Sequence, residues 1–214
     1  MTAVSEERHG AARRGRPPAS DQARREQRLH ISRAAVRLFR DHGVAGTAGR
    51  EIARAADVSE RTLWRLFRTK ESCVEPLLSQ AVESFQDAVR DCPPGRALGE
   101  HLRARYEFLP PSAGSDLDAV LAIIRLSREE PGLRAVWLLL QERAEPALAG
   151  MLARQTGLPA DGMEIRVRAA GLNAALRVVT EDFAWSTAGA ADDVDRQRRR
   201  VAEAFHAVAA TRPG

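Results

Sequence analysis

The chain has 214 residues and a formal net charge of +4 at pH 7, from 33 Lys plus Arg against 29 Asp plus Glu. A chain of this length can bury a core in one or two domains. No segment approaches the ~18 consecutive apolar residues of a transmembrane helix, and the charged N-terminus lacks a secretory signal, so we expect a cytoplasmic protein with no membrane partner and with reduced Cys73 and Cys92.

Positive charge is concentrated in the first third of the chain. Residues 1–70 hold 16 Lys plus Arg and 8 Asp plus Glu, a balance of +8, whereas residues 71–214 hold 17 and 21, a balance of −4. A basic head on a mildly acidic body suits a module that binds a polyanion and a second part with another function.

Residues 1–20 are predicted to form a disordered basic arm, because they are polar and contain Pro17-Pro18. The tetrapeptide R-G-R-P at residues 14–17 is similar to the core of an AT-hook. Arg14 and Arg16 are therefore candidates for the narrow minor groove of A·T-rich DNA. The alternative is a solvated basic tail, which would still add affinity that is independent of sequence.

Residues 21–70 are predicted to form three helices. Apolar residues recur at helical spacing over residues 29–39, which indicates a long first helix. Residues 50–56 are strong helix formers, and Ser59 is a good N-cap for a third helix over residues 60–67. Two short helices joined by a tight turn are the anatomy of a helix-turn-helix, whose second helix enters the major groove of DNA.

Four blocks follow one another between about residues 25 and 75: R-L-H-I-S-R-A-A-V-R-L-F-R-D-H-G, T-A-G-R-E-I-A, V-S-E-R-T-L-W-R-L-F and T-K-E-S. Their order, spacing and residue types resemble the TetR family of one-component transcriptional regulators, and later segments look like actinobacterial members. Three positions depart from the family pattern. Ala48 stands where Thr is common, Asp57 replaces the turn Gly, and Trp64 replaces a Tyr. Asp tolerates left-handed backbone geometry, so the turn is expected to survive.

The third helix is expected to present its polar face to DNA. The resemblance places Arg61 and Arg65 where bases are read, and Arg can bond bidentately to O6 and N7 of guanine. It places Thr62, Trp64 and Lys70 at backbone phosphates. Any single surface Arg could instead be a solvated charge. The full predicted set is Arg14, Arg16, Thr47, Arg50, Glu60, Arg61, Thr62, Trp64, Arg65, Arg68 and Lys70, in which the two residues near the start of the second helix would touch phosphate.

Residues 71–214 are predicted to form a bundle of roughly six helices. The expected helices cover residues 71–90, 96–109, 116–130, 131–156, 161–186 and 194–210. Pro146 is expected to kink the fourth of them. The fold class is therefore all-α, with a basic arm over 1–20, a DNA-binding domain over 21–70, and a ligand-binding and dimerisation domain over 71–214.

The bundle is expected to hold a small molecule and to form a dimer. Possible pocket residues are Phe85, Leu102, Tyr106, Ile123, Ile124, Trp137, Leu140, Met151, Asn173 and Arg177, although most of these are also ordinary core residues. The last two helices are the candidate homodimer interface, through Ala169, Ala170, Leu172, Ala175, Leu176, Val179, Phe183, Val201, Ala204, Phe205 and Val208. We expect no metal, no cofactor and no catalytic activity, because no motif for them is present.

The sequence is therefore interpreted as a homodimeric regulator of the TetR type, a repressor that a small, mostly apolar ligand releases from a palindromic DNA operator. Two-fold symmetry is expected because one recognition helix spans few base pairs. One alternative is an all-helical enzyme or small-molecule carrier with a purely structural helix-turn-helix. Another is an activator or architectural DNA binder that responds to no ligand.

Overall fold

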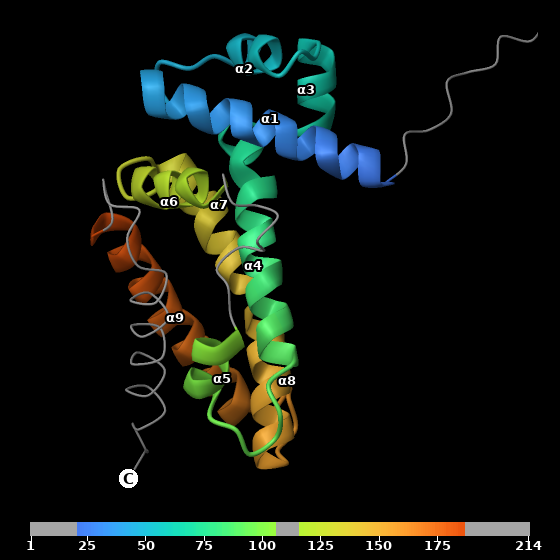
Figure 1. Cartoon of the computed structure of the whole chain (residues 1–214), viewed down its shortest axis with the longest axis vertical. Coiled ribbons are helices and arrows are strands. Elements are labelled where there is room, and N and C mark those ends of the chain that lie inside the picture. Colours follow the sequence, from blue (N-terminus) through green and yellow to red (C-terminus); the bar gives the residue numbers. More distant parts are fainter. Residues whose placement is uncertain (1–20, 106–115, 187–214) are drawn as a thin grey trace, which may run out of the picture.

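The structure is a computed structural model, and it describes residues 21–105 and 116–186. All regular elements in these ranges are helical (Figure 1). In chain order they are α1 (Asp21–His42), α2 (Gly49–Ala55), α3 (Glu60–Leu66), the short 3-10 helix η1 (Glu71–Val74), α4 (Glu75–Arg90), α5 (Leu98–Arg105), α6 (Asp116–Leu126), α7 (Pro131–Glu142), α8 (Glu145–Thr156) and α9 (Met163–Ser186). No described helix is both long and apolar enough to span a membrane.

The first three helices form a compact unit at one end of the molecule. Helix α1 crosses the end of α4, and α2 and α3 lie on the other side of α1 (Figure 1). The unit is closed by apolar side chains that are almost fully buried, including Ile31 and Phe39 of α1, Ile52 of α2 and Leu63 of α3. Ala53 and Ala56 are also buried, and their small side chains let α3 approach α2 closely.

Helix α4 runs from this unit through the length of the body (Figure 1). It packs against α1 at its start and against α5, α6, α7 and α8 further along, while α9 covers α6, α7 and α8. One hydrophobic cluster extends from Ile31 in α1 to Ala184 in α9, so the helix-turn-helix unit and the body share a continuous core. The division at residue 70 stays a prediction from sequence.

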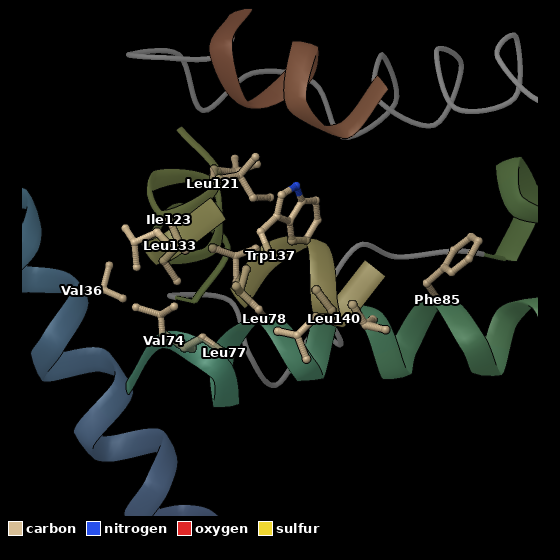
Figure 2. Packing of buried hydrophobic residues seen from close by; sticks show 14 of the residues in the cluster. Val36, Val74, Leu77, Leu78, Phe85, Leu121, Ile123, Leu133, Trp137 and Leu140 are labelled. Carbon is tan, nitrogen blue, oxygen red and sulfur yellow. The ribbon is translucent and has the colours of Figure 1, made fainter. Parts of the chain in front are cut away.

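The centre of the body is a cluster of large apolar side chains from α4, α6 and α7. Figure 2 shows Leu77 and Leu78 of α4 beneath Trp137 of α7, with Ile123 of α6 beside them. All four side chains are nearly or completely buried. Burial of side chains of this size contributes about 1.5–3 kcal/mol each relative to exposure. This cluster fixes the start of α4 against the body.

The expected kink at Pro146 is wrong, because the chain breaks into two helices. Helix α7 ends at Glu142 and α8 begins at Glu145, with Pro146 in the first turn of α8. Pro fits the first turn because its missing N–H has no acceptor within the helix there. Helix α6 ends earlier than expected, at Leu126, where the Ser127 hydroxyl donates to the carbonyl of Ile124 at 2.7 Å. The expected helix over residues 194–210 lies outside the described residues.

Candidate nucleic-acid interface

The turn between α2 and α3 has the geometry that a helix-turn-helix requires. Asp57 has a φ of +50°, in the left-handed region, so the expectation that Asp replaces the turn Gly is confirmed. The amide of Val58 donates to the carbonyl of Ala53 at 2.9 Å. Ser59 caps α3, and its hydroxyl oxygen accepts from the amide of Thr62 at 3.1 Å. These contacts fix the angle at which α3 leaves α2.

Helix α3 turns its apolar side inward and its basic side outward. Leu63 and Phe67 are buried, and Glu60, Arg61, Trp64, Arg65 and Arg68 are exposed. Within the described residues, none of these three arginines forms an ion pair. Thr62 is half-buried, and its hydroxyl shares a hydrogen bond of 3.0 Å with that of Ser59. The outward direction predicted for the recognition helix therefore agrees with the structure.

Helix α2 begins without a capping hydroxyl, because Ala48 occupies the N-cap. Glu51 supplies half of a capping box, and its Oε2 accepts from the amide of Ala48 at 2.6 Å. Arg50, in the first turn, is exposed. Its guanidinium is therefore accessible to a polyanion.

The predicted phosphate contact by the Thr47 side chain is corrected by the structure. Thr47 is only 2% exposed, and its hydroxyl donates to the carbonyl of Gly43 at 2.8 Å. Its side chain closes the loop between α1 and α2 instead of reaching the surface. Sequence spacing could not show this, because the predicted site depended only on the nearness of Thr47 to the start of α2.

Lys70, which follows α3 in the chain, stabilises the same loop through hydrogen bonds. Its Nζ donates to the carbonyl of Val44 at 2.6 Å and to that of Thr47 at 3.0 Å. An ammonium has three donors, so these bonds occupy two of them. The lysine side chain thus has a structural role that the sequence did not reveal, and its phosphate contact stays a prediction.

Arg28 joins the end of the recognition helix to the body. Its Nη1 donates to the carbonyl of Leu66, the last residue of α3, at 2.7 Å, and its guanidinium lies 4.6 Å from the centre of the Phe67 ring. Its Nη2 lies 3.7 Å from Oε2 of Glu75, the first residue of α4. Glu75 also accepts from Arg143, between α7 and α8, at 3.0 Å. A chain of polar contacts therefore runs from the α7–α8 junction to the end of α3.

Most predicted pocket residues lie in the interior of the body. Arg177 is half-buried, and Tyr106 lies outside the described residues. Figure 2 shows Ile123, Trp137 and Leu140 near one another and Phe85 further along α4, and all four belong to one hydrophobic cluster. The buried members are Phe85, Leu102, Ile123, Ile124, Trp137, Leu140, Met151 and Asn173. The structure thus gathers them into the core of the body.

Glu181 of α9 is the polar centre of this region, and the sequence analysis did not single it out. Its Oε1 accepts from Trp137 Nε1 at 3.0 Å, from Arg134 at 2.5 Å and from Arg177 at 3.2 Å. Burial alone would raise the pKa of Glu181, but these hydrogen bonds and the charge of Arg134 hold it below its ordinary value. The spacing of Arg177 and Glu181, i and i+4 on one helix, was the available signal.

Asn173 is buried in the body with one unused polar atom. Its Nδ2 donates to the carbonyl of Gln141 at 3.0 Å and to Oε1 of Glu145 at 3.3 Å. Its buried Oδ1 has no hydrogen-bond partner among the described residues. Separately, a hollow of about 450 Å³ opens beside Glu181, lined by Ile124, Arg128, Arg134, Glu181, Asp182 and Trp185. Ile124 is the one predicted pocket residue in its wall.

Residues 31–87 match the sequence profile described as "Bacterial regulatory proteins, tetR family". The helix-turn-helix segment of this chain therefore matches the TetR family profile. The chain is 31% identical over 143 residues to the HTH-type transcriptional regulator TcmR of Streptomyces glaucescens. The aligned residues cover 64% of this chain and 63% of TcmR. The chain therefore spans less than two thirds of the length of this curated relative.

Two solved structures share the TetR architecture over most of their length. Thermus thermophilus FadR, a TetR-family transcriptional repressor in complex with lauroyl-CoA, is 25% identical with a TM-score of 0.53, over 87% of this chain and 97% of FadR. A TetR-family regulator candidate from Mesorhizobium loti is 21% identical with a TM-score of 0.53, over 86% of this chain and 95% of that protein. The second comparison supports the fold alone. Both agree with the all-α assignment.

The described residues contain no group of three or more His, Cys, Asp or Glu that could hold a metal ion. The arm residues Arg14 and Arg16 lie outside the described residues, so their predicted minor-groove contact has no structural counterpart here. Of the predicted DNA-binding side chains, those that the structure leaves exposed are Arg50, Glu60, Arg61, Trp64, Arg65 and Arg68.

Proposed function

We propose that this chain is a transcriptional regulator that binds duplex DNA through α3 and acts as a homodimeric, ligand-released repressor in the cytoplasm. The observation that carries the proposal is the exposed basic face of α3, on a helix whose direction is fixed by the Ser59 cap and the Asp57 turn. A recognition helix in this position reads base edges in the major groove.

Two arginines are the proposed readers of sequence. Arg61 and Arg65 are exposed and form no ion pair within the described residues. Their guanidinium groups are therefore free to bond O6 and N7 of guanine, and each such pair supplies about 1–3 kcal/mol of discrimination. Arg50 and Arg68 are proposed to contact phosphates, which position the protein without reading sequence.

The outward face of α9 supports pairing of two copies. Leu172, Leu176 and Phe183, which were expected at the dimer interface, are buried inside the single chain, so their assignment is corrected. The exposed stripe of α9 contains the predicted Ala170 together with Met163, Val167, Gly171, Ala174 and Val178. An apolar stripe of small and large residues suits close packing against another helix. We propose that this stripe contributes to the homodimer.

The body is proposed to bind a small, mostly apolar effector. Its interior is rich in large apolar groups such as Phe85, Ile123 and Leu140, and FadR, which shares the fold, is bound to lauroyl-CoA, a molecule with an apolar acyl chain. The unpaired Oδ1 of Asn173 favours an effector that carries one hydrogen-bond donor. Binding would weaken the DNA complex by a coupling energy of about 1–3 kcal/mol, or roughly 5–150-fold.

The test of this function is selection of bound duplexes from genomic DNA, followed by affinity measurements over a range of salt concentrations. The expected outcome is a roughly palindromic site and an association constant that falls steeply with salt. Absence of a complex on selected DNA at low salt would favour the alternative of an enzyme or carrier with a structural helix-turn-helix.

A second measurement separates a repressor that responds to ligand from a regulator that does not. Acyl-CoA thioesters and neutral aromatic compounds are titrated into the protein–DNA complex. Release of DNA by one of these two classes of compound supports the effector proposal. The Trp137→Phe variant serves as the control for the body, because it loses the indole N–H that bonds Glu181. A DNA complex that no compound weakens would favour a ligand-independent regulator.

A further inference from the structure

The indole of Trp64 in α3 lies directly over Gly49, the first residue of α2. A Cβ atom added to Gly49 would lie 2.1 Å from Cζ2 and 2.6 Å from Cη2 of the Trp64 ring. Separations below 3.0 Å essentially never occur for real Cβ atoms. The six-membered ring of the indole therefore occupies the space that any side chain at position 49 would need.

The lack of space beside Trp64, rather than the backbone conformation, explains why position 49 is a glycine. The φ angle of Gly49 lies outside the left-handed region, so an L-residue could adopt the local backbone. Gly43, by contrast, has a φ of +72° and no atom near its missing Cβ. Gly43 and Gly49 thus meet different requirements, and an added Cβ at Gly49 would collide with a side chain of the recognition helix.

Trp64 is not a core residue, although it packs on α2. Its exposed fraction is 44%, whereas Leu63 beside it in sequence is completely buried. The six-membered ring lies against Gly49 in the first turn of α2, and Arg61 and Arg65 of α3 are exposed as well. Within the described part of the chain, no hydrogen bond occupies the indole N–H, so this donor is available to an external acceptor.

We propose that Gly49 and Trp64 form a matched pair in which Gly49 is a positioning residue that holds the Trp64 indole on the DNA-binding face. The proposal rests on the DNA-binding function proposed above. Contact with α2 at Gly49 restricts the rotamers of Trp64 before DNA arrives, so less side-chain entropy is lost on binding. A side chain at position 49 would displace the ring and move its N–H away from the acceptor that it meets in the complex.

The pairing predicts that the effects of substitutions at the two positions are coupled. Gly49→Ala should weaken binding to the selected duplex by about tenfold, the loss expected for one hydrogen bond to a charged group. Tyr lacks the atoms of the indole that meet the added methyl group. Gly49→Ala combined with Trp64→Tyr should therefore bind more tightly than Gly49→Ala alone, because the smaller ring leaves room for Ala.

The matched control is Gly150→Ala in α8, where the nearest atom to an added Cβ is Nη1 of Arg154 at 3.8 Å. This variant should bind DNA as the original protein does. Thermal unfolding of the original protein and of the Gly49→Ala, Trp64→Tyr, double and Gly150→Ala variants shows whether each is folded. Acrylamide quenching reports the exposure of Trp64. The Trp64 signal is the difference between each protein and its Trp64→Tyr counterpart, and it should become more accessible in Gly49→Ala.

The outcomes divide cleanly. Recovery of affinity in the double variant, with greater quenching in Gly49→Ala, supports the pair. Unchanged affinity of Gly49→Ala, or losses in the double variant equal to the product of the two single losses, overturns it. If Gly49→Ala does not fold, Gly49→Ser and its Trp64→Tyr double variant repeat the comparison. Failure of the original protein to bind any selected duplex would instead reject the DNA-binding function, whatever the quenching shows.

Discussion

Arg33 of α1 and Asp116, the first residue of α6, form a two-point ion pair between the helix-turn-helix unit and the body. The Nε–Oδ1 and Nη2–Oδ2 distances are both 2.7 Å. The Asp116 side chain is 2% exposed, whereas that of Arg33 is 42% exposed. The hydrogen bonds that Arg33 donates to Asp116 raise the pKa of Arg33. The pair ties α6 to the helix that carries α2 and α3 on its other side.

The two partners of this pair should differ in their effect on stability. Arg33→Ala leaves a carboxylate buried without its cation, which typically lowers the free energy of unfolding by about 3–5 kcal/mol. Asp116→Asn leaves a guanidinium that water can still reach, so a smaller loss of about 1–2 kcal/mol is expected. Urea unfolding of both variants and of the double variant measures which substitution lowers the free energy of unfolding more. Equal losses in that free energy would show that burial of Asp116 does not determine the contribution of the pair.

The recognition unit could be predicted closely from sequence because its signals are local. Ser59 caps α3 from one residue away, and Asp57 sets the turn within the same segment. The partners of Lys70, by contrast, lie 23 and 26 residues earlier in the chain, and nothing in the local pattern points to them. Thr47 was misassigned for the same reason, since its burial depends on how the loop folds back on α1.

The body was less predictable, because its ambiguities are settled only by packing. Pro146 is compatible with a kink or with a helix start, and the sequence does not distinguish them. Helix α9 has apolar residues on both sides, so the sequence alone did not show that Leu172 faces the core and Val178 faces outward. Glu181 was missed because two of its three partners, Arg134 and Trp137, come from another helix.

Lys70 should affect stability as well as DNA binding. Lys70→Met keeps much of the aliphatic chain but removes the ammonium that bonds the carbonyls of Val44 and Thr47. We expect a loss of about 1–3 kcal/mol in the free energy of unfolding, the range for hydrogen bonds to a charged group. Thermal unfolding in the absence of DNA measures it. An unchanged melting temperature with weaker DNA binding would assign Lys70 to phosphate contact alone.

Glu181 should make part of the stability depend on acidic pH. Its folded pKa is lowered, so its contribution is fully present above the unfolded value of about 4.3 and is lost as pH falls through the folded pKa. Glu181→Gln removes the charge that Arg134 and Arg177 share. Urea unfolding should show a gap in the free energy of unfolding between the original protein and this variant at pH 7. This gap should narrow as the pH is lowered below about 4. A gap that stays constant with pH would mean that the charge of Glu181 contributes nothing.

Base reading and phosphate contact should separate on α3 and α2. Arg65→Ala should lower affinity for the selected site by about 1–3 kcal/mol and relax the preference at one position, because Arg65 is exposed and unpaired within the described residues. Arg50→Ala, at the start of α2, should weaken all duplexes alike and reduce the salt slope by about one. Binding to the selected site, to single-base variants and to an unrelated duplex, each over a salt series, distinguishes the two roles. The assignment fails if Arg65→Ala leaves every single-base preference intact, because a side chain that reads a base edge cannot be removed without loss of discrimination at that base.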